Sequence, residues 1–98
     1  MHAAALRVEL HVPDSHSLKE KRRVVRKLVE GLRRQGSLSV AEVDHHDTWQ
    51  RVAVGVAIVA PDGPHLESLI ERVRRYVDDQ IEVHVIDVRL RYLEAPDG

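Results

Sequence analysis

The sequence predicts an α+β sandwich in which two helices cover one face of a four-stranded antiparallel sheet. Four short segments carry alternating or continuous apolar residues, as in strands, and two segments of similar length carry apolar residues at helical spacing. Their order along the chain is β-α-β-β-α-β. The 98 residues are enough for one domain with one modest core, and no linker or repeat divides them. Residues 94–98 form a polar tail that we expect to fray.

The first strand and the first helix have clear boundaries in the sequence. Apolar and polar residues alternate over residues 6–12, and Pro13 ends this strand. Ser17 is the expected N-cap of the helix, and Glu20 completes a predicted capping box with it. Gly36 is expected to take the left-handed conformation and end the helix. The apolar stripe predicted to face the core consists of Leu18, Val25, Leu28, Val29 and Leu32.

The later elements follow different patterns. A change in alternation within the second strand, at residues 38–44, indicates a bulge near Ala41. Residues 51–60 are apolar on both faces, which is typical of a strand at the centre of a sheet. The cap of the second helix lies within residues 62–63, and the last strand covers residues 81–93.

Two right-handed crossovers joined by a hairpin give a ferredoxin-like fold with strand order 4-1-3-2 and both helices on one face. In this topology the loop after the first strand lies beside the hairpin turn at residues 45–48. The N-terminus of the first helix points into the same region and favours an anion there. We therefore expect the functional surface at this edge.

The composition excludes several classes of protein. No cysteine is present, which rules out disulfides and thiolate zinc sites and favours a cytoplasmic location. No apolar run reaches the roughly 18 residues that a transmembrane helix needs, so we expect no membrane partner. One Trp, two Tyr and no Phe argue against a module that stacks bases on its sheet.

Charge is segregated along the chain despite a net charge of −1. Residues 18–35 carry eight Lys or Arg against two Glu, so the other residues are acidic in sum. A basic helix face of this kind suits a polyanion such as RNA, although a solvated face that only confers solubility is the alternative. The candidate nucleic-acid or anion-binding residues are Ser17, Lys19, Lys21, Arg22, Arg23, Arg26 and Lys27.

The adjoining hairpin supplies a candidate partner surface, made of His16, Asp44, His45, Asp47, Trp49 and Arg51. Imidazole and carboxylate groups here, with His46, would suit zinc or iron, but no pair of ligands at helical spacing fixes their geometry. A polar turn is the simpler interpretation. Acid–base catalysis would lack a nucleophile, so we assign no catalytic residue, metal or cofactor and favour a non-enzymatic protein. Trp49 either packs over the end of the sheet or anchors a partner.

The sheet face away from the helices is a second candidate surface. The strand at residues 51–60 is apolar on this face too, and charged residues of the first and last strands flank it. An apolar stripe with a charged border is typical of a contact surface, so we expect a homo-oligomer through this open face. Alternatively, the small residues Ala53, Gly55 and Ala57 leave too little apolar area there.

Two stretches, VELHVPDSHSLKEKRRVV at residues 8–25 and VAEVDHHDTWQRVAVGVA at residues 40–57, carry a family resemblance. The chain resembles the YlxP-like family of small bacterial proteins, a domain of unknown function numbered 503. The resemblance implies a ferredoxin-like fold and no established activity. The resemblance also implies a gene that neighbours translation-initiation and ribosome-maturation genes. This association implies RNA or a ribonucleoprotein as the partner. His46 departs from the family pattern, which weakens a metal role for it.

Overall fold

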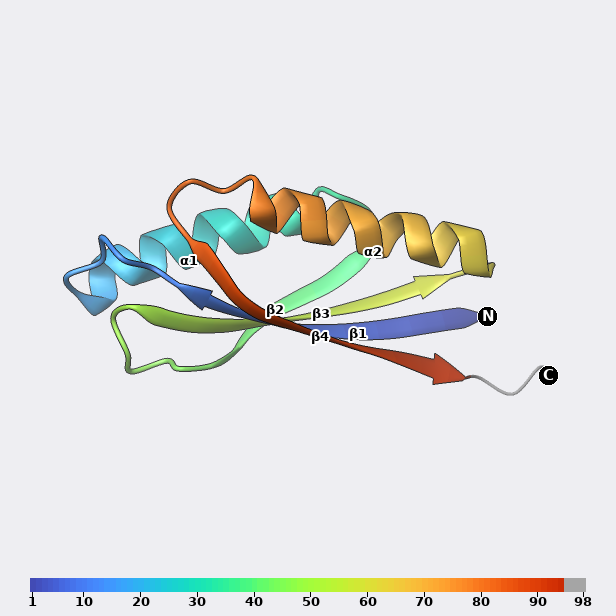
Figure 1. The fold of residues 1–98 in the computed structure, drawn as a ribbon, viewed down its shortest axis with the longest axis horizontal. Coiled ribbons are helices and arrows are strands. Elements are labelled where there is room, and N and C mark those ends of the chain that lie inside the picture. The colour runs from blue at the N-terminus through green and yellow to red at the C-terminus, as the bar shows by residue number, and fades with distance from the viewer. Residues whose placement is uncertain (95–98) are drawn as a thin grey trace.

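The predicted order of strands and helices is confirmed in a computed structural model of the chain, which describes residues 1–94. Figure 1 shows the six elements: β1 (His2–His11), α1 (Leu18–Arg33), β2 (Leu38–Asp44), β3 (Arg51–Ala60), α2 (Gly63–Asp78) and β4 (His84–Glu94). Residue 94, where we expected the frayed tail to begin, is the last residue of β4. The rest of the predicted tail, residues 95–98, lies outside the described residues.

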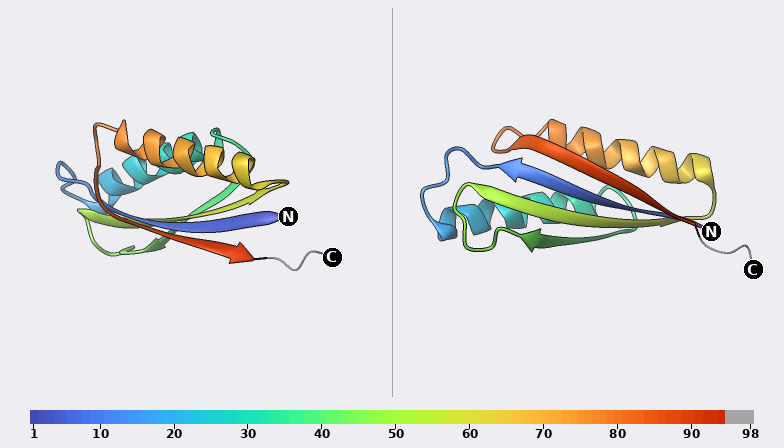
Figure 2. Two further views of the ribbon diagram at one scale, coloured as in Figure 1. Left: turned by 45° about the vertical axis from the view of Figure 1, so that its right-hand side comes forward. Right: turned by 60° about the horizontal axis from the view of Figure 1, so that its bottom comes forward.

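The four strands form one antiparallel sheet in the order β2-β3-β1-β4, and both helices cover the same face (Figure 1, Figure 2). This is the predicted ferredoxin-like α+β fold. β1 and β3 lie in the middle because the two crossovers each place a strand on the outside. The C-terminal half of the chain therefore ends in an edge strand, β4, beside the strand that began the chain.

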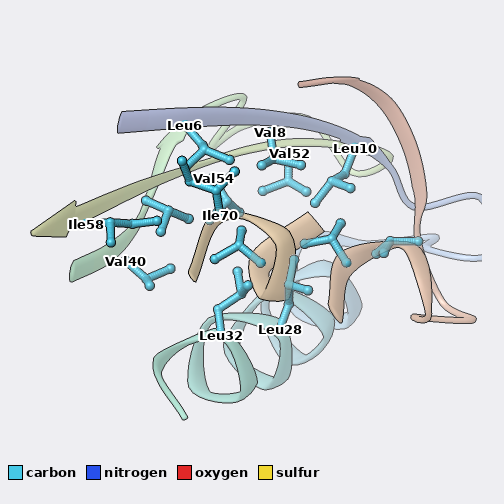
Figure 3. Packing of buried hydrophobic residues seen from close by; sticks show 14 of the residues in the cluster. Leu6, Val8, Leu10, Leu28, Leu32, Val40, Val52, Val54, Ile58 and Ile70 are labelled. Carbon is cyan, nitrogen blue, oxygen red and sulfur yellow. The ribbon is translucent and has the colours of Figure 1, made fainter. Parts of the chain in front are cut away.

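The core lies between the sheet and the two helices (Figure 3). Alternation in β1 directs Leu6, Val8 and Leu10 towards the helices, each at most 2% exposed. The neighbouring strand β3 contributes Val52 and Val54, both fully buried. With no Phe in the chain, branched aliphatic side chains supply nearly all of this buried apolar area, and its burial is the main favourable term in folding.

The start of α1 is predicted correctly, and its end is not. Ser17 accepts a hydrogen bond from the Glu20 backbone N–H at 3.1 Å, as an N-cap should. The Glu20 carboxylate accepts from the His16 N–H at 2.7 Å instead of from the N–H of Ser17, so the expected capping box is displaced by one residue. Gly36 does not adopt a left-handed conformation. The helix ends in short-range bonds, among them Gln35 N–H to the Leu32 carbonyl at 2.9 Å, and Gly36 instead lies against α2.

Two strand predictions also need correction. The bulge of β2 lies between Glu42 and Asp44, two residues beyond the predicted position, so Val43 is its extra residue. β4 begins at His84, later than expected. The residues before it do not extend the sheet, because Val83 is buried in the core while Ile81 is 92% exposed.

The open face of the sheet is covered in part by the loop at residues 45–50, which passes on the side away from the helices (Figure 1). Ala53, on that face of β3, is fully buried. Among the described residues, no helix combines the length and the apolar character needed to cross a bilayer.

Candidate nucleic-acid interface

Five cations line the solvent side of α1, and we call them the α1 basic strip: Lys19, Arg22, Arg23, Arg26 and Lys27. All five are exposed, because helical periodicity places them opposite the buried positions Val24, Val25 and Leu28. Each of them has another member three or four residues away, so charges on adjacent turns lie beside one another on the helix surface. The arrangement keeps several like charges together on the surface.

Only part of this charge is neutralised within the protein. Glu82 pairs with Arg23 at 3.0 Å and with Lys27 at 3.4 Å, yet both cations remain about two-thirds exposed. The Arg23 hydrogen bond, helped by Lys27, holds the pKa of Glu82 below its ordinary value despite partial burial. Within residues 1–94, no carboxylate lies within 4.0 Å of the charged groups of the other three members, Lys19, Arg22 and Arg26.

Lys21, which the sequence placed on this face, is buried and does not belong to the strip. It is 1% exposed and donates hydrogen bonds to the carbonyls of His45 and Arg51, the latter at 3.1 Å. Its ammonium also lies 3.4 Å from Glu42 Oε2, which forms no hydrogen bond of its own. Helical spacing explains the error, since position 21 precedes Val24 by three residues and shares its core-facing side.

Ser17 also has a structural role. Its hydroxyl oxygen caps the helix by accepting from the Glu20 N–H, and Glu20 in turn occupies the N–H of His16. These bonds use part of the hydrogen-bonding capacity that the sequence analysis assigned to an anion at the helix N-terminus. The positive surface of α1 is therefore formed mainly by side chains.

The loop after β1 and the β2–β3 hairpin lie together, as the topology predicted. The Gln50 amide donates to the carbonyls of Pro13 and Ser15, each at 3.2 Å, and the Val12 N–H donates to the Gln50 carbonyl at 2.9 Å. Lys21 adds the contacts from α1 to the two ends of the hairpin loop. The basic strip and the hairpin are thus held in a fixed relation.

Three members of the predicted partner surface form a charge cluster on the sheet face away from the helices. Asp44 pairs with Arg7 at 2.9 Å, and both Arg51 (3.2 Å) and His45 Nε2 (3.0 Å) contact Glu9. The backbone of His45 is left-handed, with φ of 64°, which turns its ring back towards β1. Arg7 and Glu9 were not predicted as site residues from the sequence. Alternation in β1 placed them on this face, but the pairing register is needed to bring them to the hairpin.

The cluster lowers the pKa of both of its carboxylates, Glu9 and Asp44. Burial alone would raise the pKa of Glu9, but hydrogen bonds from Arg7, Arg51 and His45 outweigh it and hold the pKa below its ordinary value. The pKa of Asp44 is lowered chiefly by the Arg7 hydrogen bond and then by the His45 backbone N–H. Both acids are therefore charged at neutral pH and serve as counter-ions inside the protein.

The other predicted partner residues, His16, Asp47 and Trp49, are exposed at the surface. Trp49 is 54% exposed, which favours the interpretation of it as a contact residue over packing on the sheet end. In the part of the chain that the structure describes, no three His, Asp or Glu side chains are grouped so as to hold a metal ion.

Comparison with known proteins agrees with the two motif stretches. The profile of a family described as "Protein of unknown function (DUF503)" matches residues 3–90. The chain belongs to this family. The uncharacterized protein YlxP of Bacillus subtilis (strain 168) is 32% identical over 75 residues, which cover 76% of this chain and 82% of that protein.

Solved structures add information on the fold alone. The de novo designed protein Foldit4 matches with a TM-score of 0.55 and 16% identity, covering 97% of this chain and 99% of its own. The designed protein Ferredog-Diesel has a TM-score of 0.46 and 11% identity, and the match covers 91% of this chain and 83% of the designed chain. The likeness to Foldit4 supports the ferredoxin-like arrangement.

The buried ammonium of Lys21 should contribute strongly to stability. We expect Lys21→Met to lower the free energy of unfolding by about 3 kcal/mol, because it removes the ammonium beside the part-buried Glu42 Oε2 and a donor from two hairpin carbonyls. Urea denaturation at neutral pH measures this. Lys27→Met is the matched control, since Lys27 is exposed on the same helix and its loss should cost no more than about 0.5 kcal/mol. Equal losses in the two variants would contradict the structural role.

The charge cluster predicts an acid-sensitive fold. The folded-state pKa of Glu9 lies below its ordinary value of 4.5, so the stabilisation is complete above about pH 4.5 and lost as pH falls through the folded-state value. We expect Glu9→Gln to lose about 2 kcal/mol at pH 7 and to show a weaker decline in stability below pH 4.5 than the wild type. Urea midpoints measured from pH 7 to pH 3 test this, with exposed Glu30→Gln as the control that keeps the wild-type profile.

Proposed function

We propose that this protein binds RNA, free or within a ribonucleoprotein, through the α1 basic strip. The observation that carries the proposal is five exposed cations on one helix, for which Glu82 is the single pairing carboxylate among residues 1–94. Phosphate groups are the natural counter-ions for such a strip, and their neutralisation releases condensed cations from the nucleic acid. Because Glu82 leaves both of its cationic partners largely exposed, it can be displaced by a phosphate at modest cost.

The mechanism is recognition of the phosphate backbone. Arg22, Arg23 and Arg26 offer guanidinium groups that bind phosphate with paired hydrogen bonds, and the two lysines add point charges. Backbone contacts position a protein without distinguishing bases, so we expect weak sequence preference. The hairpin that carries Trp49 adjoins the N-terminal end of the strip through the Lys21 contacts, and it is the natural place for a contact beyond phosphate.

A salt titration tests the proposal. If all five cations contact phosphates of a single strand, the logarithm of the binding constant should fall with the logarithm of salt concentration with a slope of about −3.5. We expect Arg22→Glu with Arg26→Glu to weaken binding at least about tenfold and to reduce the slope by about 1.4, since two contacts are lost. Filter binding with a labelled single-stranded RNA gives both quantities.

The matched control is Arg89→Glu with Arg91→Glu, which changes the net charge equally but lies on β4. The alternation and register of β4 place both residues on the open sheet face, away from α1. We expect this variant to retain most of the affinity. Similar losses in the two double variants, or a wild-type affinity that does not depend on salt, would rule out the basic strip as the RNA contact.

A second candidate function is homodimerisation through the open sheet face. Val59 and Leu93 are each 59% exposed and flank Ala3 in one row across three strands. Two copies related by a two-fold axis could bury these rows against each other, because such an interface uses the same patch twice. The charge cluster at Glu9 covers the other end of this face, so the apolar area lies at the end near the N-terminus.

Light scattering tests the dimer directly. The wild type should have twice the 11.2 kDa chain mass at micromolar concentrations, and Val59→Lys with Leu93→Lys should return it to one chain mass by placing like charges in the interface. The Arg22→Glu, Arg26→Glu variant should keep the wild-type mass, since α1 lies on the other side of the sheet (Figure 1). A wild type of one chain mass would exclude this function.

A further inference from the structure

A hollow of about 320 Å³ lies between the C-terminal end of α1 and the outer side of α2. Three of its lining residues are arginines that come from two different helices. Arg34 is the C-cap of α1, and Arg72 and Arg75 lie one turn apart on α2. The complete lining is Arg34, Gln35, Arg72, Arg75, Tyr76 and Asp79.

The lining of this arginine hollow carries excess positive charge. Asp79 is the acidic residue in the lining, and Glu71 pairs with Arg75 at 3.2 Å from outside it. Three guanidinium groups around one small space repel one another, so the site gains most from an added anion. A phosphate suits it because guanidinium groups bind phosphate oxygens in a planar, bidentate manner.

Local contacts hold the site in shape without a ligand. Arg72 donates to the Gln35 carbonyl at 3.1 Å, and the Gln35 amide donates to the Gly31 carbonyl at 3.2 Å. Tyr76 packs so closely on Gly31 that a Cβ there would lie 1.6 Å from the tyrosine oxygen. The first bond occupies one of five guanidinium N–H groups of Arg72, and the others stay available.

The end of α1 explains part of this arrangement. Carbonyls at a helix C-terminus attract cations, and Arg72 satisfies one of them at Gln35. One cation, Arg72, is enough to satisfy the Gln35 carbonyl. It accounts neither for Arg34, which contributes a third guanidinium, nor for the open volume that the three arginines share.

We propose that the arginine hollow is a phosphate-binding subsite formed by Arg34, Arg72 and Arg75. The proposal extends the proposed RNA function but does not depend on it. Arg34 lies seven residues beyond Lys27, about 10 Å along the same helix, so a phosphate chain on the basic strip can reach the hollow. The phosphate belongs either to the RNA backbone or to a free phosphorylated molecule.

Pyrophosphate is the probe that tests the subsite without RNA. In NMR titrations of the full chain we expect amide shifts centred on Gln35 and Tyr76, saturating in the millimolar range. Arg34→Gln together with Arg72→Gln should weaken this binding about tenfold or more. Arg74→Gln is the matched control, because Arg74 lies between Arg72 and Arg75 on α2 but does not line the hollow. This variant should bind pyrophosphate as the wild type does.

Loss of the Arg72 hydrogen bond could disturb the end of α1, so Arg34→Gln is also measured alone. The Arg34 side chain is exposed, and its removal leaves the Arg72 to Gln35 bond in place. We expect it to weaken pyrophosphate binding severalfold with an unchanged urea midpoint. Shifts that do not centre on the hollow, or equal weakening by Arg74→Gln, would overturn the proposal.

The RNA assay then identifies the source of the phosphate. If the RNA backbone occupies the hollow, Arg34→Gln with Arg72→Gln should lower RNA affinity and reduce the salt slope by about 0.7 for each lost contact. If pyrophosphate binding is lost while RNA binding is kept, the site serves a free phosphorylated molecule. The Arg22→Glu, Arg26→Glu variant separates the two proposals, because it should weaken RNA binding at least about tenfold and leave pyrophosphate binding at the hollow intact.

Discussion

The buried ammonium of Lys21 is the contact on which the candidate surface depends. It joins a helix to both ends of the hairpin loop by donating to the carbonyls of His45 and Arg51, with Glu42 as its counter-ion. Burying a lysine is costly unless its donors are occupied, and here three acceptors surround one group. A shift of the hairpin relative to α1 would break several of these interactions at once. The position of the loop that carries Trp49 is therefore fixed relative to the strip on α1.

The distribution of acids explains why that surface stays positive. Glu9 and Asp44 bind Arg7, Arg51 and His45 on the far side of the sheet, where they balance the charge of the open face. Glu42 is taken up by Lys21. The helical layer keeps the excess cations, which form both the α1 basic strip and the arginine hollow. A chain of net charge −1 can thus present a strongly basic side to a polyanion.

Periodicity was sufficient to predict the order of elements, the central position of β3 and the start of α1, because these depend on local alternation and on a capping side chain. It failed where tertiary contacts decide. A lysine in a basic run looks solvent-exposed until the hairpin carbonyls that bind it are known, so Lys21 was misplaced. Arg7 and Glu9 required the strand register. The arginine hollow joins residues 38 positions apart, from Arg34 to Arg72, and no local pattern connects them.

The bulge at Val43 resolves a geometric conflict in β2. Residues two apart on a regular strand point to the same side, yet Glu42 serves the helical layer and Asp44 the opposite layer, with only one residue between them. The additional residue reverses the parity of the strand at that point. One short edge strand thereby supplies a counter-ion to each side of the sheet.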